Sequence, residues 1–126
     1  MTSRNIRIGR LGEEAARRYL EGRGYRVLDR NWRSPAAEGP GELDLVLRDR
    51  RALVVCEVKT RTGAALAHPA EAVTPDKAAR LRRLAVLWLR EHPAARRSVR
   101  IDVVAVRLDP RAPHPLVAIE HLRAVA

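Results

Sequence analysis

Two apolar segments of this 126-residue chain carry acidic residues at positions where buried strands are normally apolar. The first covers residues 41–46 (Gly-Glu-Leu-Asp-Leu-Val) and the second covers residues 53–59 (Leu-Val-Val-Cys-Glu-Val-Lys). Their alternation predicts two strands, and a turn over residues 49–51 sets Asp44 directly across from Glu57. Facing side chains of a hairpin lie about 5 Å apart at Cβ. Two carboxylates that close repel unless a cation lies between them, so the pattern predicts a metal site.

The alternation also assigns faces to both strands. The three leucines of residues 42–47 are expected on one face, and Asp44 on the other with Glu42, which is either a second acid of the site or a strand-end charge. Lys59 is two residues beyond Glu57 and projects beside the metal, where it can orient or deprotonate a water or neutralise a phosphate. The backbone carbonyl of Val58 is a plausible third ligand. The alternative is a surface lattice of ion pairs, since Glu-x-Lys is common. The second strand divides into Val54, Cys56 and Val58 on one face and Leu53, Val55, Glu57 and Lys59 on the other.

A helix is predicted from about Ile8 to Gly22, with residues 1–7 flexible before it. Glu13 falls at the edge of its apolar stripe, where it either completes the metal site or covers the rim of the core, whereas Glu14 falls on the solvent side. Gly22 or Gly24 ends the helix. The stripe consists of Leu11, Ala15, Ala16, Tyr19 and Leu20.

A second helix is predicted from Thr74 to about Glu91, because Thr74 is a good N-cap, proline and aspartate follow it, and Pro93 ends the segment. Lys77 lies at the head of its buried face, either reaching the site or a phosphate, or covering the core beneath it. Arg80 lies on its flank. The four charges Glu13, Asp44, Glu57 and Lys77 can therefore meet on one face of a sheet. The buried face consists of Leu81, Leu84, Ala85 and Trp88.

Three further strands are predicted at residues 25–32, 99–108 and 116–122, the last as a short strand or extended edge. Residues 34–41 and 61–73 are expected to be loops. The order is then αβββαβ with one further strand, which predicts an α/β protein with a mixed central sheet flanked by helices in a single domain over residues 1–126. Asp102 interrupts an apolar run and is expected to pair with a nearby arginine.

The net charge of +10 predicts a polyanionic partner, with nucleic acid ahead of anionic membrane; the alternative is a solvated basic surface. The chain has no Phe and only two Trp and two Tyr, so it offers few aromatic side chains on which the bases of single-stranded nucleic acid could stack. The single cysteine, Cys56, lies in an apolar run and is expected in the core. The longest apolar run, residues 84–89, is too short to cross a bilayer, and no apolar signal region opens the chain, so we expect a cytoplasmic protein.

Asp44 followed by Glu57-Val58-Lys59 on the next strand resembles the active-site core of the PD-(D/E)xK nuclease superfamily, which includes restriction endonucleases and Holliday-junction resolvases. Leu43 stands where the superfamily motif has proline. The whole chain resembles more closely the YraN-like family of uncharacterised bacterial proteins (uncharacterised protein family 0102). The matching stretches are residues 12–20, 24–25, 31–33, 41–46, 55–61 and 72–75, Lys77, and residues 100–104.

The resemblance implies a restriction-endonuclease-like fold and a nuclease that uses Mg²⁺ or Mn²⁺ on DNA, with branched or flapped DNA as the expected substrate. Carried over by position, Asp44 and Glu57 are metal ligands, Lys59 is the catalytic lysine, and Glu13 is the helix carboxylate of resolvase-like members. The expected contacts to nucleic acid are Lys77, Arg61 and Arg80. A homodimer is a further expectation from the resolvases, although no self-complementary patch is readable. The alternative function is a non-catalytic nucleic-acid-binding or adaptor protein with the same fold.

Overall fold

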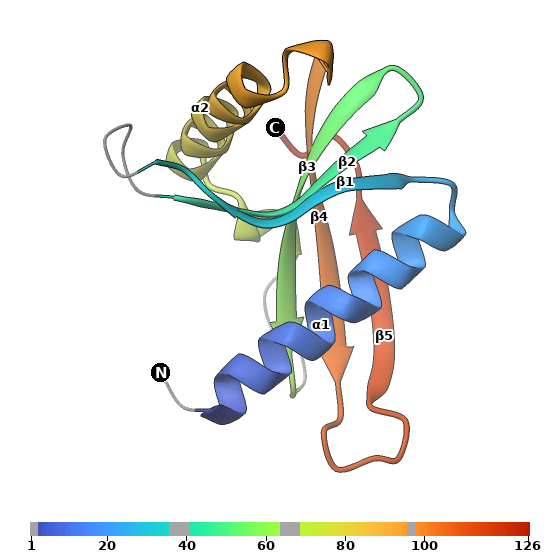
Figure 1. Ribbon diagram of the computed structural model, residues 1–126. Coiled ribbons are helices and arrows are strands. Elements are labelled where there is room, and N and C mark those ends of the chain that lie inside the picture. Colours follow the sequence, from blue (N-terminus) through green and yellow to red (C-terminus); the bar gives the residue numbers. More distant parts are fainter. Residues whose placement is uncertain (1–2, 36–40, 64–68, 96–97) are drawn as a thin grey trace.

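The computed structural model describes residues 3–35, 41–63, 69–95 and 98–126, and it confirms a mixed α/β fold with the αβββαβ order and one further strand (Figure 1). Much of each expected loop lies outside these residues. Short 3₁₀ helices cover Pro69–Ala72 and Pro93–Ala95. The main elements are α1 (Ser3–Gly22), β1 (Arg26–Arg33), β2 (Glu42–Asp49), β3 (Ala52–Arg61), α2 (Pro75–Glu91), β4 (Ser98–Leu108) and β5 (Leu116–Leu122).

Helix α1 begins at Ser3, so the predicted start at about Ile8 was wrong and omitted Ser3 to Arg7. Those residues are exposed and lack an apolar stripe, which is why periodicity did not reveal them. The helix ends in a Schellman motif, in which the Tyr25 N–H donates to the Leu20 carbonyl at 3.0 Å and the Gly24 N–H to the Glu21 carbonyl at 3.0 Å. Gly24 has φ of +91°, so Gly24 is the residue that stops α1.

The sheet has the order β1-β2-β3-β4-β5. Strands β3 and β4 are parallel and are joined through α2, while the other neighbours are antiparallel. The β2–β3 register runs from Asp49↔Ala52 to Leu45↔Cys56, as the predicted turn requires. Beyond Leu45 this ladder stops, and β2 continues only with β1. Figure 1 shows the consequence, because the start of β2 runs off to the left together with β1, while the lower part of β3 continues downward beside β4.

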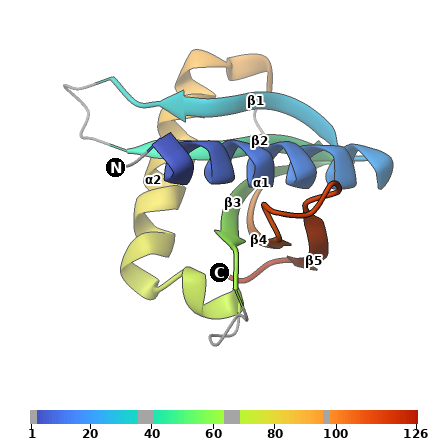
Figure 2. The same cartoon turned by 90° about the horizontal axis from the view of Figure 1, so that it is seen from below.

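The two helices cover opposite faces of the sheet (Figures 1 and 2). One core cluster lies beneath α1 and includes Leu20, Leu45 and Cys56, all at most 1% exposed. The other lies beneath α2 and includes Val46 and Trp88. The prediction that Cys56 is a core residue is confirmed, and burial raises the pKa of its thiol well above the ordinary value. Both faces of β2 and β3 are thus fixed by packing up to the point where the strands separate.

The predicted faces of β2 and α1 were each wrong in one position. Leu43 packs in the α2 cluster, whereas Leu45 packs in the α1 cluster, so the leucines of β2 do not share one face. The alternation fails beside Asn31, which lies opposite Asp44 in the β1–β2 register and has φ of +49°. Leu11 was expected in the buried stripe of α1 but is 36% exposed, because Ile8 and Gly12 take the positions against the sheet.

Helix α2 follows the prediction closely. The Thr74 side chain accepts the Lys77 N–H at 3.2 Å, and Pro75 occupies the first turn. The expected buried face is confirmed, and Leu87 joins it. Trp88, which is 2% exposed, donates its indole N–H to Asp29 of β1 at 2.9 Å, which ties α2 to the far edge of the sheet.

Gly12 allows α1 to approach β3, and replacing it should destabilise the protein. A Cβ at Gly12 would lie 1.9 Å from the Thr60 hydroxyl oxygen and 2.9 Å from the Thr60 Cβ. Overpacking costs about 1–3 kcal/mol, which exceeds the gain of about 1 kcal/mol that alanine brings to a helix. We expect Gly12→Ala to lower the free energy of unfolding in urea and Gly9→Ala, which meets nothing within 4 Å, to raise it. Equal effects of the two substitutions would contradict this packing.

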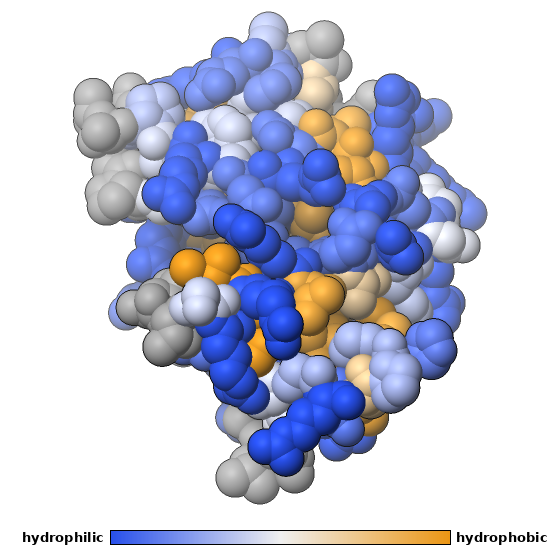
Figure 3. All heavy atoms as spheres, turned by 60° about the horizontal axis from the view of Figure 1, so that its bottom comes forward, coloured by the Kyte–Doolittle hydropathy of each residue, from blue (hydrophilic) through white to orange (hydrophobic). Residues whose placement is uncertain are grey.

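Hydrophilic side chains dominate the face seen in Figure 3, with apolar residues in smaller patches between them. Within the described segments, no helix is both long and apolar enough to span a membrane. The large apolar side chains exposed among the described residues are Ile6, Leu11, Val86, Leu116 and Val117.

Candidate active site

Asp44 occupies the point at which β2 and β3 separate. Its carboxylate accepts the backbone N–H of Val58 at 2.9 Å, so the side chain spans the two strands where their ladder has ended. The predicted register is confirmed one step earlier, at Leu45↔Cys56, and its extension sets Asp44 against Glu57. A carboxylate in this position is anchored to β3 through the peptide that follows Glu57.

The environment of Asp44 disfavours its negative charge. Burial is the largest cause and the neighbouring charge of Glu57 is the next, with smaller contributions from Glu13 and Glu42. The hydrogen bond from Val58 opposes these effects but does not cancel them, and the pKa of Asp44 rises from 3.8 to about 7. Three other carboxylates, those of Glu57, Glu13 and Glu42, therefore lie within electrostatic reach of Asp44.

Glu57 is held by Lys77 of α2. The Lys77 Nζ lies 2.8 Å from Glu57 Oε1, and the side chains are only 21% and 12% exposed. A partly buried pair is screened less by solvent than a surface pair. Lys77 therefore reaches the site, as one of the two sequence interpretations proposed, and supplies a positive charge next to the acidic residues.

Lys59 lies beside this pair on the same side of β3. Burial is the main cause that lowers the pKa of Lys59, and the charge of Lys77 adds to it, while Glu57 acts in the opposite direction. Lys59 is thus close enough to both residues to sense their charges. A lysine that releases its proton more readily than usual is suited to proton transfer.

Glu13 approaches from the other face of the sheet. Its Oε2 accepts the Asn31 side-chain N–H at 2.7 Å, and the same Asn31 nitrogen donates to Glu42 Oε1 at 3.2 Å. Because α1 and α2 cover opposite faces, the charges converge on Asp44 from both sides rather than on one face as expected. Asn31 was missed by sequence reasoning, although asparagine is among the residues other than glycine that most readily adopt its left-handed conformation.

The basic residues expected to contact nucleic acid border this site. Arg61 ends β3, and its charge contributes to the lowered pKa of Lys59. Arg80 lies one turn after Lys77 on α2 and is exposed. Neither arginine forms an ion pair with another residue that the structure describes. Both guanidinium groups are available to an anionic partner.

No group of three or more His, Cys, Asp or Glu side chains is arranged to hold a metal ion in the described segments. The donor chemistry still suits a hard divalent cation, because Asp44, Glu57 and Glu13 offer carboxylate oxygens and the Val58 peptide adjoins Asp44. Burial is the largest cause of the raised pKa of Asp44, and a bound cation would offset the second cause, the neighbouring negative charge of Glu57. In the structure, Lys77 neutralises part of that charge.

Asp102 belongs to a separate network, as predicted. It is 0% exposed and accepts Arg100 Nε at 2.9 Å, His121 Nε2 at 2.8 Å and the Ala124 N–H at 2.9 Å. Burial raises the pKa of Asp102, but these hydrogen bonds together outweigh burial and hold it below its ordinary value. Arg100 also reaches Asp49 and the Tyr25 hydroxyl, so the network joins β4 to the hairpin turn and to β1.

The fold and site define a class of α/β proteins with an acidic site at the divergence of two central strands and two lysines beside it. The chain belongs to the uncharacterised protein family UPF0102, whose family model matches residues 12–106. It is 56% identical to a UPF0102 protein of Frankia alni over 92% of this chain and 91% of the relative. It is 57% identical to one of Beutenbergia cavernae over 94% of each chain, and 54% identical to one of Streptomyces coelicolor over 94% and 88%. The resemblance to this family is thereby confirmed.

The raised pKa of Asp44 predicts an unusual pH dependence of stability in the absence of metal. Asp44 keeps its proton when folded up to about pH 7, whereas the unfolded chain loses it near the ordinary aspartate pKa of 3.8. The folded state therefore binds more protons between these values, so stability falls as the pH rises through this window, by up to about 4 kcal/mol. Urea unfolding in EDTA at pH 5 and pH 8 measures this fall. Asp44→Asn should abolish it, and parallel profiles for the two proteins would contradict the prediction.

Proposed function

We propose that this protein is a metal-dependent nuclease that hydrolyses DNA phosphodiester bonds with Mg²⁺ or Mn²⁺. The observation that carries the proposal is the position of Asp44, which bridges the separating strands next to Glu57 and Lys59. The same three positions match the PD-(D/E)xK motif. A structural role alone gives no reason to place mutually repelling carboxylates together at a partly open end of two strands.

Each residue has a role that its surroundings suit. The cation would be held by Asp44, Glu57, Glu13 and the Val58 carbonyl. When bound, the cation would neutralise the negative charge that builds up on the phosphate during hydrolysis. Lys59, with its lowered pKa, accepts a proton from the attacking water or donates a hydrogen bond to the phosphate. Phosphodiester hydrolysis then forms a P–O bond to water and breaks the bond to the sugar oxygen.

The basic rim would hold the DNA backbone. Lys77 contacts Glu57, Arg61 ends β3 close to Lys59, and Arg80 follows Lys77 by one turn of α2. Arginine and lysine contacts to phosphates position a duplex without reading its sequence. Branched or flapped DNA is the proposed substrate, by the resemblance to resolvases. Two copies acting together would present two such sites to a symmetric junction.

A non-catalytic nucleic-acid-binding protein is the second candidate, and one contact favours it. The Lys77–Glu57 pair at 2.8 Å occupies one of the ligands that a metal would need. With a net charge of +10, such a protein would still bind phosphates. The two candidates differ in whether Asp44 and Glu57 bind a cation.

Incubation of the purified protein with linear, flapped and four-way DNA, with Mg²⁺, Mn²⁺ or EDTA, tests the proposal. We expect cleavage of at least one substrate with a divalent cation, none in EDTA, and none by Lys59→Ala. Cleavage that survives Lys59→Ala would place the chemistry elsewhere. Binding of DNA without cleavage of any substrate would favour the second candidate.

A further inference from the structure

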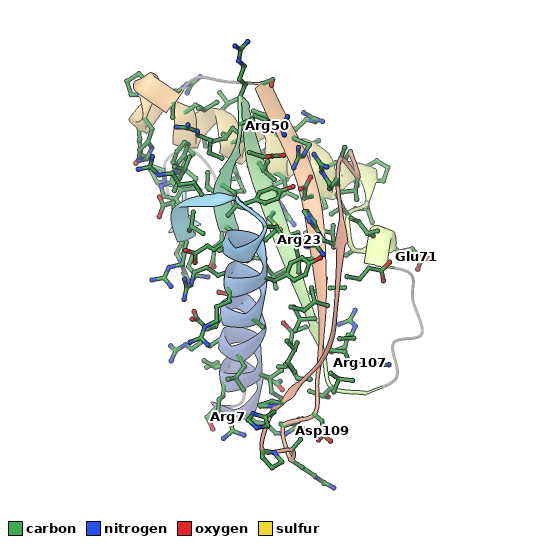
Figure 4. The ribbon with its side chains drawn as sticks, turned by 90° about the vertical axis from the view of Figure 1, so that its right-hand side faces the viewer. Arg7, Arg23, Arg50, Glu71, Arg107 and Asp109 are labelled. Carbon is green, nitrogen blue, oxygen red and sulfur yellow. The ribbon has the colours of Figure 1, made fainter. Side chains whose placement is uncertain are left out.

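A second, separate pocket lies at the opposite end of the hairpin from Glu57 and Lys59. It has a volume of about 820 Å³ and is formed where the end of α1, the turn between β2 and β3, and the end of β5 meet. Figure 4 shows Arg23 at the end of α1 and Arg50 at the hairpin turn. Because Glu13 and Arg23 are ten residues apart on or just after α1, roughly 15 Å separates their backbones along the helix axis. The lining residues include Arg23, Arg50, Arg123, Asp49, Tyr25 and His121.

The charges of this pocket are unbalanced. Three arginines line it against a single carboxylate, Asp49. Asp49 is already neutralised by Arg100 at 2.8 Å and by Arg123 at 3.2 Å. Arg23 and Arg50 form no ion pair with any other described residue, and Arg23 instead lies 4.8 Å over the Tyr19 ring. The pocket therefore holds guanidinium groups with unused N–H donors.

The floor of the pocket is rigid and offers a further donor. Tyr25 is 9% exposed, and its hydroxyl oxygen accepts Arg100 at 2.9 Å, which leaves its own hydrogen free to donate. His121 is fixed by Asp102 at 2.8 Å and lies edge-on to Tyr25, with ring centroids 5.5 Å apart. A merely solvated basic surface does not need such a floor, whereas a binding site gains from one.

We propose that this arginine pocket binds a phosphate group. Planar guanidinium forks match the oxygens of a phosphate, and several around one hollow favour a dianion or polyanion over a single carboxylate. The phosphate can belong to a nucleic-acid backbone or to a free phosphorylated molecule, and both use the same chemistry. The inference does not depend on the nuclease proposal, since no metal ligand lines the pocket.

Calorimetric titration with inorganic pyrophosphate and anisotropy of a labelled DNA duplex, both in EDTA, test the proposal. We expect Arg23→Gln combined with Arg123→Gln to weaken pyrophosphate binding at least tenfold. The matched control combines Arg51→Gln with Arg111→Gln, which also removes two positive charges but from exposed turn residues that do not line the pocket. Thermal unfolding of each variant separates lost binding from lost fold, and Arg123→Lys, which retains the charge without the fork, should rescue binding only partly.

The two sources of phosphate give different results. If DNA is the ligand, the double variant also loses DNA affinity, and its salt dependence becomes shallower by about two phosphate contacts. If the ligand is a small phosphorylated molecule, pyrophosphate binding is lost while DNA affinity equals that of the control. Absence of pyrophosphate binding by the native protein, or equal losses in the double variant and in the control, would overturn the proposal. Either overturning result leaves the cleavage experiments unaffected.

Discussion

Replacing Asp102 with alanine is expected to lower the free energy of unfolding by about 3–5 kcal/mol. The side chain is 0% exposed and accepts hydrogen bonds from Arg100, His121 and the Ala124 amide. Alanine removes the acceptor of all three donors, and although Arg100 keeps its contact with Asp49, the unsatisfied donors that remain cost more than a lost surface contact. Because small domains are stable by only about 5–15 kcal/mol, this single change should remove a large part of the total.

Urea denaturation of Asp102→Ala measures this effect, and a double-mutant cycle identifies its cause. In an Arg100→Met background the guanidinium is gone, so Asp102→Ala should cost less than it does alone. Asp109→Ala is the control, since Asp109 is exposed at a turn and bonds only a neighbouring backbone N–H. A loss below about 1 kcal/mol for Asp102→Ala, or strict additivity with Arg100→Met, would contradict the role assigned to the network.

Glu57→Gln is expected to lower metal-dependent DNA cleavage by at least about a hundredfold. The amide keeps the shape of the side chain but removes the charge that the proposed cation requires. It also removes the ionic partner of Lys77, so the charge next to Lys59 changes at the same time. The measurement is the single-turnover rate of cleavage on the best substrate, with Mg²⁺ in excess.

The matched control for Glu57→Gln is Glu91→Gln, at the exposed last position of α2. Glu91→Gln changes the net charge by the same amount as Glu57→Gln but touches none of the site residues. The cleavage rate of Glu91→Gln should therefore equal that of the native protein. Equal rates for Glu57→Gln and the native protein would remove Glu57 from the mechanism. Loss of folding in Glu57→Gln is separated from loss of chemistry by its thermal unfolding.

The sequence predicted the parts of the fold that local patterns determine. The hairpin register follows from the turn at residues 49–51, and one step of extension brings Asp44 to Glu57. Helix α2 was readable from Thr74 and Pro75, because caps and first-turn prolines act within a few residues. The pairing of Asp102 with a nearby arginine was also foreseen, since a buried carboxylate on a strand needs a cation nearby, and the structure identifies that arginine as Arg100.

Features that depend on distant parts of the chain were not predictable in the same way. The change of face at Leu43 arises where β2 leaves β3, opposite the left-handed Asn31 of another strand. The link from Glu13 through Asn31 to Glu42 joins three elements and has no local pattern. Similarly, two alternatives for Lys77 remained until the packing of α2 placed its Nζ on Glu57.

The arginine pocket also depends on distant parts of the chain and was not predictable from the sequence. Arg23, Arg50 and Arg123 are separated along the chain and stand among many other arginines. Only the Schellman turn at Gly24, the positive φ of Arg50 and the pairing of β5 with β4 bring these segments to one end of the molecule. Composition predicts a basic protein, whereas only the fold divides its charge between the acidic site and the pocket.

Calorimetric titration of metal-free protein with Mg²⁺ at pH 8 tests the central claim most directly. At this pH, above the value of about 7 to which the pKa of Asp44 is raised, its carboxylate is ionised and can bind a cation. The account predicts saturable binding by the native protein and its loss in both Asp44→Asn and Glu57→Gln, with Glu91→Gln unchanged. No saturable binding by the native protein, or the same binding in all three variants, would contradict it.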